Sequence, residues 1–268
     1  MKLDVNGHST YCYTGGKAFD AAKPTAIFIH GALNDHSVWI LQTRYLANHG
    51  WNVLAVDLPG HCRSAGSPPA SVEQAADFVL ALMDAAGVQK AALVGHSFGS
   101  LIALEAAGRA PQRVSHLVLV GTAHPMKVAP ALLENSQSQP FKAIDMVNTF
   151  SHFTLAPPPS TLGPGTWLYG GSKALMKRVL ASNQAVNVFH TGFKACNDYS
   201  HGEAAMALVT APTLFVLGRQ DQMTPAKAAQ SLIAKAARPT VLMLDAGHSL
   251  MSEAPDGVLF AIRDFLQP

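Results

Sequence analysis

The sequence GHSFG at residues 95–99 constrains the fold of this 268-residue chain more than any other stretch. It follows the apolar run at 91–94 and precedes apolar residues at helical spacing up to residue 107. Two glycines around a serine let a strand and a helix approach closely at a strained turn, which lifts the hydroxyl above a sheet. The N-terminus of such a helix also favours developing negative charge. We therefore predict strand, tight turn and helix, with Ser97 as a candidate nucleophile.

The same five-residue pattern can arise by chance in a chain with 21 glycines. The flanking strand and helix patterns favour the functional interpretation. The length of the chain fits one α/β domain with an insertion better than two independent domains.

The composition gives no sign of a nucleic-acid or membrane partner. Lysine and arginine total 19 against 17 aspartate and glutamate residues, and no block of like charge occurs. No apolar run approaches the ~20 residues of a membrane span, and the N-terminal stretch lacks a signal-peptide core. We expect a cytoplasmic monomer or homodimer whose partner is a small-molecule substrate.

Cysteine and histidine usage gives no sign of a disulfide framework or a metal site. Cys12, Cys62 and Cys196 are odd in number and far apart, which indicates reduced thiols. The 12 histidines form no HExxH motif or tight cluster of metal-ligand spacing. We therefore expect neither a metal nor a cofactor.

Short apolar runs between turn residues predict a mostly parallel eight-stranded sheet flanked by helices. The first two runs flank Asn6-Gly7, a dipeptide typical of hairpin turns, so they should pair antiparallel at the sheet edge. A helix should follow the Ser71 cap. The expected strands are residues 2–5, 9–13, 25–29, 51–56, 91–94, 114–120, 212–217 and 240–244.

Loops at the carboxyl ends of these strands carry the candidate reactive groups. HGAL at 30–33 can offer backbone N–H groups to an oxyanion, although His-Gly there could also be an ordinary turn. Asp221 and His248 follow the last two strands, at the same edge as Ser97. A serine hydroxyl needs a neutral imidazole to take its proton and a carboxylate to orient that imidazole. The sequence thus predicts a triad of Ser97, Asp221 and His248.

Two other residues compete for these roles. His96 neighbours Ser97, but in a tight turn its side chain points away from the serine, so we interpret it as structural. Asp57 also follows a strand, but it precedes the nucleophile, and a carboxylate is suited to brace the turn at Pro59-Gly60.

The alternation of strands and helices breaks after residue 121. A weakly patterned block with a Pro157–Pro159 run and Gly163-Pro164-Gly165 is typical of a helical insertion over the ligand crevice. We predict a core domain of residues 1–121 and 208–268 and a helical lid of residues 122–207. The substrate pocket should be mainly apolar, because charged residues of the lid are few and mixed. The expected substrate contacts are Leu33, Met126, Phe150 and Phe153.

The whole chain resembles the α/β-hydrolase superfamily, in particular its lidded single-domain group of carboxylesterases and related enzymes. The order of nucleophile, acid and histidine is the order of that family. The resemblance implies an oxyanion hole formed by the backbone N–H groups of Phe98 and Ala32, with Leu33 as the alternative to Ala32. The family usually has glycine where this chain has Cys62. The matching motifs are HGAL at 30–33, DLPGHCRS at 57–64, GHSFG at 95–99, PTLFVLGRQDQMTP at 212–225 and AGHS at 246–249.

The leading hypothesis is a serine hydrolase that cleaves a small uncharged carboxylic ester through an acyl-enzyme intermediate. A carbon–carbon bond, lactone or thioester hydrolase could use the same triad, because the lid sets the substrate. A ligand receptor that keeps the hydrolase fold without turnover is an alternative of another class. It is disfavoured because pure binding does not need a polarised serine.

Overall fold

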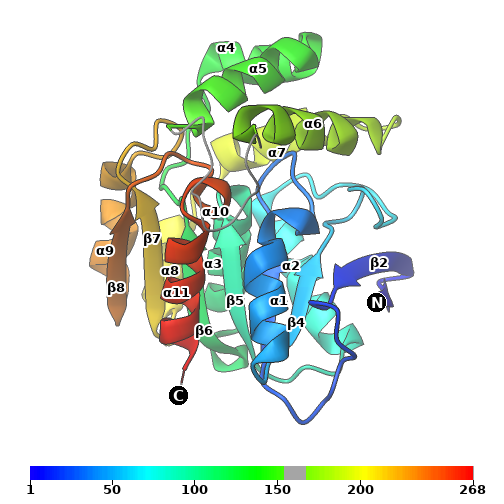
Figure 1. The fold of residues 1–268 in the computed structure, drawn as a ribbon, viewed down its shortest axis with the longest axis vertical. Helices are drawn as coiled ribbons and strands as arrows, with labels where there is room; N and C mark the ends of the chain where they lie inside the picture. The colour runs from blue at the N-terminus through cyan, green and yellow to red at the C-terminus, as the bar shows by residue number, and fades with distance from the viewer. Residues whose placement is uncertain (154–166, 268) are drawn as a thin grey trace.

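Eight strands form one sheet in the order β1-β2-β4-β3-β5-β6-β7-β8 (Figure 1). The computed structural model describes residues 1–153 and 167–267. β2 pairs antiparallel with both β1 and β4, and all other neighbouring strands are parallel. The predicted mostly parallel eight-stranded sheet is therefore confirmed. The strands are β1 (Lys2–Val5), β2 (His8–Tyr13), β3 (Thr25–Ile29), β4 (Asn52–Val56), β5 (Ala91–His96), β6 (Val114–Val120), β7 (Thr213–Gly218) and β8 (Pro239–Leu244).

The central strands are buried on both faces. Every residue of β3, β4, β5 and β7 is buried, which explains their continuous apolar sequences. The predicted hairpin turn is also present, since Asn6 and Gly7 have φ angles of 54° and 80°. In the centre of the sheet Ile29 pairs with Gly95, so the carboxyl ends of β3 and β5 lie side by side. This register brings the loop after β3 beside the turn after β5.

Helices cover both faces of the sheet (Figure 1). One face carries α1 (Ile40–Asn48) and α11 (Pro255–Leu266), and the other carries α2 (Val72–Ala85), α3 (Phe98–Arg109), α8 (Gly202–Leu208) and α9 (Gln230–Lys235). Ser71 caps α2 as predicted, because its Oγ accepts a hydrogen bond from the Gln74 N–H at 3.2 Å. The short helices are η1 (His36–Trp39), η2 (Pro111–Arg113), η3 (Ala226–Ala229) and α10 (Leu250–Glu253).

Four helices lie together above the sheet edge (Figure 1), and we propose that they form the lid. They share an apolar cluster that includes Ile144, Val179 and Phe189, to which the core contributes Leu33. The segments Pro157–Pro159 and Gly163–Gly165 lie outside the described residues. These helices are α4 (Pro130–Ser138), α5 (Pro140–Ser151), α6 (Leu168–Ala181) and α7 (Val188–Asp198).

Helix α8 falls within the predicted insertion at 122–207 but packs on the core helix α3. A Cβ atom added to Gly108 of α3 would lie 2.8 Å from the Ala205 carbonyl oxygen of α8. Among the helices of residues 1–153 and 167–267, none is both long enough and apolar enough to cross a membrane.

A buried carboxylate attaches α6 to the core. Arg178 of α6 donates a hydrogen bond to Asp35 Oδ2 at 2.6 Å, and Asp35 Oδ1 accepts from the Ser37 N–H at 2.9 Å. Burial alone would raise the pKa of Asp35. The hydrogen bonds from Ser37 and the Arg178 guanidinium outweigh burial and lower that pKa to about 2.

The loop after β4 is attached to the end of α6. The Cys62 N–H donates to Ser182 Oγ at 3.0 Å, and Asn183 Nδ2 donates to the Gly60 carbonyl at 3.1 Å. Cys62 has a φ of 46°, a conformation in which glycine is the least strained residue. This backbone conformation explains why a glycine suits the position where the chain has cysteine. Burial, with Asp35 nearby, raises the pKa of the Cys62 thiol to about 12.

Replacing Asp35 with Asn should lower the free energy of unfolding by ~2 kcal/mol at pH 7, because a hydrogen-bonded buried charge is lost. The folded-state pKa of Asp35 is depressed, so its contribution is complete above the unfolded pKa of ~4. That contribution is lost as the pH falls toward about 2. Urea denaturation at pH 7 and pH 3 should therefore show a smaller difference from the parent at pH 3.

The matched control is Asp20→Asn, since Asp20 pairs with Lys23 on the surface. It should leave stability unchanged at both pH values. A constant difference for Asp35→Asn across this pH range would contradict the assigned role of the Asp35 charge.

Candidate active site

The turn after β5 holds Ser97 in a strained backbone conformation. Ser97 has φ 52° and ψ −118°, between the last residue of β5 and the first of α3. A Cβ atom on Gly95 would lie 2.1 Å from the Gly99 carbonyl oxygen, and one on Gly99 would lie 2.3 Å from the Ile29 carbonyl oxygen. Neither position can hold a side chain, which is the predicted reason for both glycines. The predicted order of strand, tight turn and helix is also confirmed.

The loop at residues 30–33 lies directly beside this turn. A Cβ atom on Gly31 would lie 3.3 Å from Ser97 Cβ, and Ala32 lines a small cavity together with Ser97 and His248. Phe98 is the first residue of α3, so its N–H has no carbonyl one turn earlier in that helix to donate to. Leu33 has φ 57° and buries its side chain in the cluster shared with α4 to α7.

His30 ties this loop to the loop after β4. Its Nδ1 donates to the Gly31 carbonyl at 2.8 Å, and its Nε2 accepts from the Leu58 N–H at 3.2 Å. Burial lowers the pKa of His30. The imidazole is therefore neutral, which is the state that lets Nε2 accept a hydrogen bond.

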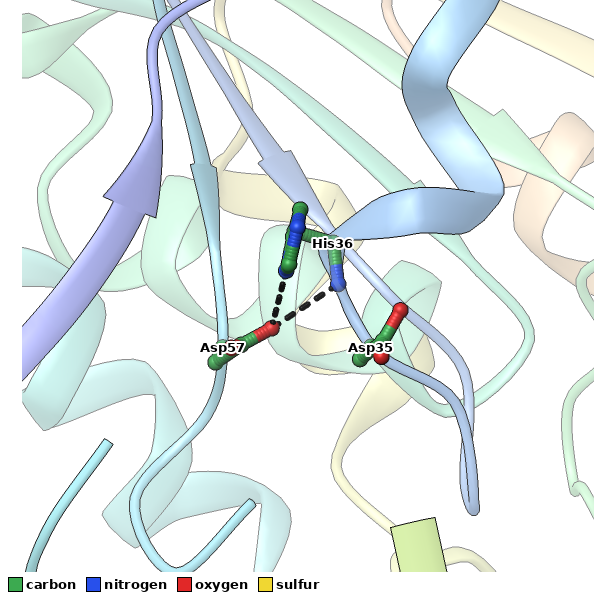
Figure 2. A group of neighbouring side chains, drawn as sticks. All are labelled: Asp35, His36 and Asp57. Carbon is green, nitrogen blue, oxygen red and sulfur yellow. Dashed lines mark hydrogen bonds and ion pairs between the residues drawn. The ribbon is translucent and has the colours of Figure 1, made fainter. Parts of the chain in front are cut away.

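Asp57 contacts both loops, and in its own loop Oδ2 accepts from the Arg63 N–H at 3.3 Å, which agrees with the predicted bracing of that turn. Its Oδ1 accepts from the His36 backbone N–H at 2.9 Å and from His36 Nδ1 at 2.7 Å (Figure 2). Asp35 completes a group whose potential ligand atoms lie within 4.8 Å of one another. Figure 2 shows no hydrogen bond or ion pair between Asp35 and the other two side chains. Asp35 binds Ser37 and Arg178 instead, so the contacts assign this group to loop structure.

The structure brings Asp221 and His248 into direct contact. His248 Nδ1 donates to Asp221 Oδ2 at 2.8 Å, and Asp221 Oδ1 accepts from the N–H groups of Met223 and Thr224 at 2.8 Å each. Burial alone would raise the pKa of Asp221. The neighbouring His248 and the hydrogen bonds from His248 and Thr224 outweigh burial and hold that pKa well below its usual range. Asp221 is therefore a carboxylate that fixes one tautomer of His248.

Thr224 is a member of this site that the sequence argument missed. Its Oγ1 donates to Asp221 Oδ2 at 2.7 Å and lies 3.0 Å from His248 Nδ1. The available signal was its place three residues after Asp221, in the turn opened by that carboxylate.

His96 contacts the loop of His248 and not the serine. Its Nε2 donates to the His248 carbonyl oxygen at 2.9 Å. Burial, followed by the charge of His248, lowers the pKa of His96 to about 3. These contacts agree with the structural role that the sequence predicts for His96.

Ser97 and His248 line a common cavity of about 230 Å³, which we call cavity A. Met126 and Phe150 also line it, whereas Phe153 lies beyond the end of α5 and is 57% exposed. Most of the other residues that line cavity A are apolar. They include Val128, Ala129, Leu132, Met146, Phe193 and Met223.

One cationic side chain, Lys127, is also part of the described lining of cavity A. Its Nζ donates to the Asn197 carbonyl at 2.7 Å. The prediction of a mainly apolar pocket therefore describes most of the wall, with Lys127, Gln222 and Thr224 as exceptions away from Ser97 and His248.

Residues 24–255 match the family described as alpha/beta hydrolase fold, and the chain belongs to that family. It is 27% identical over 268 residues to the pimeloyl-[acyl-carrier protein] methyl ester esterase of Aliivibrio fischeri (strain MJ11), covering 96% of this chain and 97% of that protein. The enol-lactonase of Burkholderia xenovorans LB400 has the same fold, with a TM-score of 0.81, 21% identity and 99% coverage of both chains.

A shorter stretch of 122 residues is 39% identical to the dihydrolipoyllysine-residue acetyltransferase component of the acetoin cleaving system from Cupriavidus necator. The match covers 44% of this chain and 30% of that protein. The chain thus spans less than a third of the length of that relative.

Replacing Gly99 with Ala should lower the free energy of unfolding by ~3 kcal/mol, because the new methyl group would overlap backbone atoms that cannot move independently. The matched control is Gly171→Ala, in helix α6. A Cβ atom there meets nothing within 4 Å, so stability should stay unchanged or rise. Thermal or urea denaturation of the two variants measures the contrast. Equal stability of both variants would show that the turn is not held by close backbone contact.

Proposed function

We propose that this protein is a serine hydrolase that cleaves small uncharged carboxylic esters through an acyl-enzyme intermediate. One observation carries the proposal: His248, which donates a hydrogen bond to the buried Asp221, lines the same cavity as Ser97. The strained turn would supply the nucleophile Ser97, and this turn and the loop at residues 30–33 would supply the oxyanion hole. The esterase among the full-length relatives supports the choice of bond.

In the proposed first step, His248 Nε2 takes the proton of the Ser97 hydroxyl as Oγ attacks the ester carbonyl carbon. The carbonyl oxygen becomes an oxyanion that accepts hydrogen bonds from the N–H groups of Phe98 and Ala32. The tetrahedral intermediate then expels the alcohol oxygen, which takes the proton from His248. The acid half of the substrate remains bonded to Ser97.

In the second step, water gives a proton to His248 and attacks the acyl carbon. The Ser97 oxygen leaves and takes that proton back, which releases the carboxylic acid and restores the site. Asp221 stays ionised throughout, because its pKa is held below the usual range. It orients His248 through Nδ1 and stabilises the imidazolium while His248 holds the proton.

The wall of cavity A supports an uncharged acyl group. An unpaired carboxylate among Met126, Leu132 and Phe150 would lose its hydration without gaining a partner. A lactone is a cyclic ester, and it would follow the same two steps.

Replacing Ser97 with Ala should reduce hydrolysis of a chromogenic short-chain ester by ~10⁴-fold or more, because the nucleophile is lost. The matched control is Ser138→Ala at the exposed end of α4, where Oγ bonds the Glu134 carbonyl of its own helix. It should keep parental activity. Near-parental activity of Ser97→Ala would exclude the proposed nucleophile.

A fluorophosphonate probe provides the companion measurement. It should label the parent protein on Ser97 and leave folded Ser97→Ala unlabelled. Absence of labelling in the folded parent would favour a ligand receptor over an enzyme.

A neutral ester should have a kcat/KM at least ~10-fold above that of an isosteric ester with a carboxylate on its acyl chain, because the apolar wall cannot compensate for lost hydration. Steady-state kinetics on the two substrates measures this ratio. Preference for the charged ester would contradict the prediction. If that preference disappeared in Lys127→Gln, the lysine on the cavity wall would be its source.

A further inference from the structure

A second cavity, of about 290 Å³, lies between helix α6 and the core elements η1, α1 and α10. We call it cavity B. A small cavity of about 60 Å³ lies next to both cavity A and cavity B, and Ser97 and His248 line it. It shares Phe193 and Met223 with cavity A. It shares Asn34, His96, Ser172 and Ser249 with cavity B. Ser97 therefore lines cavity A and the small cavity, and the small cavity shares four of its lining residues with cavity B.

The polar residues of cavity B are uncharged. Within the part of the chain that the structure describes, no carboxylate, lysine or arginine belongs to its lining. Its hydrogen-bonding side chains are Asn34, Ser37, His96, Trp167, Ser172, Ser249 and Ser252. Four of them, Asn34, Ser172, Ser249 and Ser252, place an amide or hydroxyl group on this wall. Among the described residues, Ser97 and Thr224 are the only ones with a hydroxyl group in the lining of cavity A.

His96, which lines both cavity B and the small cavity, holds one buried acceptor without a partner in the described part of the chain. Its Nε2 carries the proton that is donated to the His248 carbonyl, so Nδ1 of the neutral ring bears a lone pair. This buried Nδ1 has no hydrogen-bond partner among the described residues. Cavity B thus offers donors and acceptors in a wall without net charge.

The outer rim of cavity B is apolar and exposed to solvent. Ile40 and Leu41 are 37% and 36% exposed, and both line the cavity. Exposed apolar side chains around a hollow with convergent polar groups are typical of a ligand entrance.

We propose that cavity B binds the alcohol half of the ester, and that this alcohol is uncharged and carries additional hydroxyl or amide groups. The inference rests on the proposed ester hydrolysis. The acyl half is hydrocarbon beyond its carbonyl group and suits the apolar wall of cavity A. The alcohol is the half that can carry the hydrogen-bonding groups that the serines and Asn34 would satisfy. Cleavage at Ser97 then separates the two halves into the two cavities.

Gly171 provides a way to fill cavity B without disturbing the reaction centre. It lies in helix α6 on the wall of cavity B, and a Cβ atom there meets nothing within 4 Å. Gly171→Leu should therefore fold and occupy part of the cavity, and Gly171→Ala is the control of minimal size. Ala129→Leu is the matched change on the wall of cavity A.

Three butyrate esters form the substrate panel: methyl, butyl and 2,3-dihydroxypropyl. The parent protein should have a kcat/KM for the dihydroxypropyl ester ~10-fold above that for the butyl ester of similar size, because only the former satisfies the polar groups of cavity B. Gly171→Leu should remove this preference mainly through KM and leave the methyl ester unchanged. Gly171→Ala should keep the preference. Ala129→Leu should slow all three esters by a similar factor.

Two results would overturn the inference while leaving ester hydrolysis intact. One is equal use of the butyl and dihydroxypropyl esters by the parent. The other is an equal loss for the methyl and dihydroxypropyl esters in Gly171→Leu. Turnover of the methyl ester by the parent shows in the same experiment that the proposed function holds.

A binding measurement separates the two proposals if no ester is cleaved. Calorimetric titration with 3-butoxypropane-1,2-diol, an ether that cannot be hydrolysed, should show binding to the parent that weakens ~10-fold in Gly171→Leu and persists in Gly171→Ala. Absence of binding to the parent, or equal affinity for dibutyl ether, would overturn the assignment of cavity B.

Discussion

The contact between backbone atoms at Gly95, Gly99 and Ile29 is the constraint on which the site depends. Because neither glycine has a side chain, the first turn of α3 lies against both β5 and the end of β3. That contact sets the position of the Phe98 N–H relative to the loop at residues 30–33. The oxyanion hole we propose therefore depends on the spacing of two strands and a helix. Ser97 takes up the strained conformation and lines cavity A with a half-buried side chain.

Burial has opposite consequences for the ionisable groups around this contact. His30 and His96 are buried with backbone partners, so burial lowers the pKa of each ring and keeps it neutral. Asp221 is also buried, but His248 and the hydrogen bonds in its turn keep it ionised. The difference lies in the partners. A backbone carbonyl stabilises a protonated histidine less than His248 stabilises the Asp221 carboxylate. Asp221 thus supplies a buried negative charge directly beside the imidazole that would handle the proton.

Local patterns predicted the sheet, the Ser71 cap and the strained turn, because each depends on residues close together in the sequence. Thr224 was missed because its role depends on the distance of its hydroxyl from His248, 24 residues away in the chain. The ion pair of Asp35 and Arg178 joins positions 143 residues apart, which no periodicity reveals. The sequence shows that Cys62 stands where the family usually has glycine. The structure gives the physical reason for that glycine, since residue 62 has a positive φ. The roles of the triad and the substrate contacts remain predictions.

The frame around Ser97 and the walls of the cavities are built from different kinds of contact. This difference affects how the sequence of such a protein can change during evolution. The frame around Ser97 is made of close backbone approaches, which tolerate almost no change of residue. Helices α4 to α7 supply much of the wall of both cavities through side chains. Their apolar cluster can be repacked with residues of similar volume without loss of the fold. Inherited substitutions can therefore accumulate on these helices and alter what is bound, while the reactive groups below them keep their geometry.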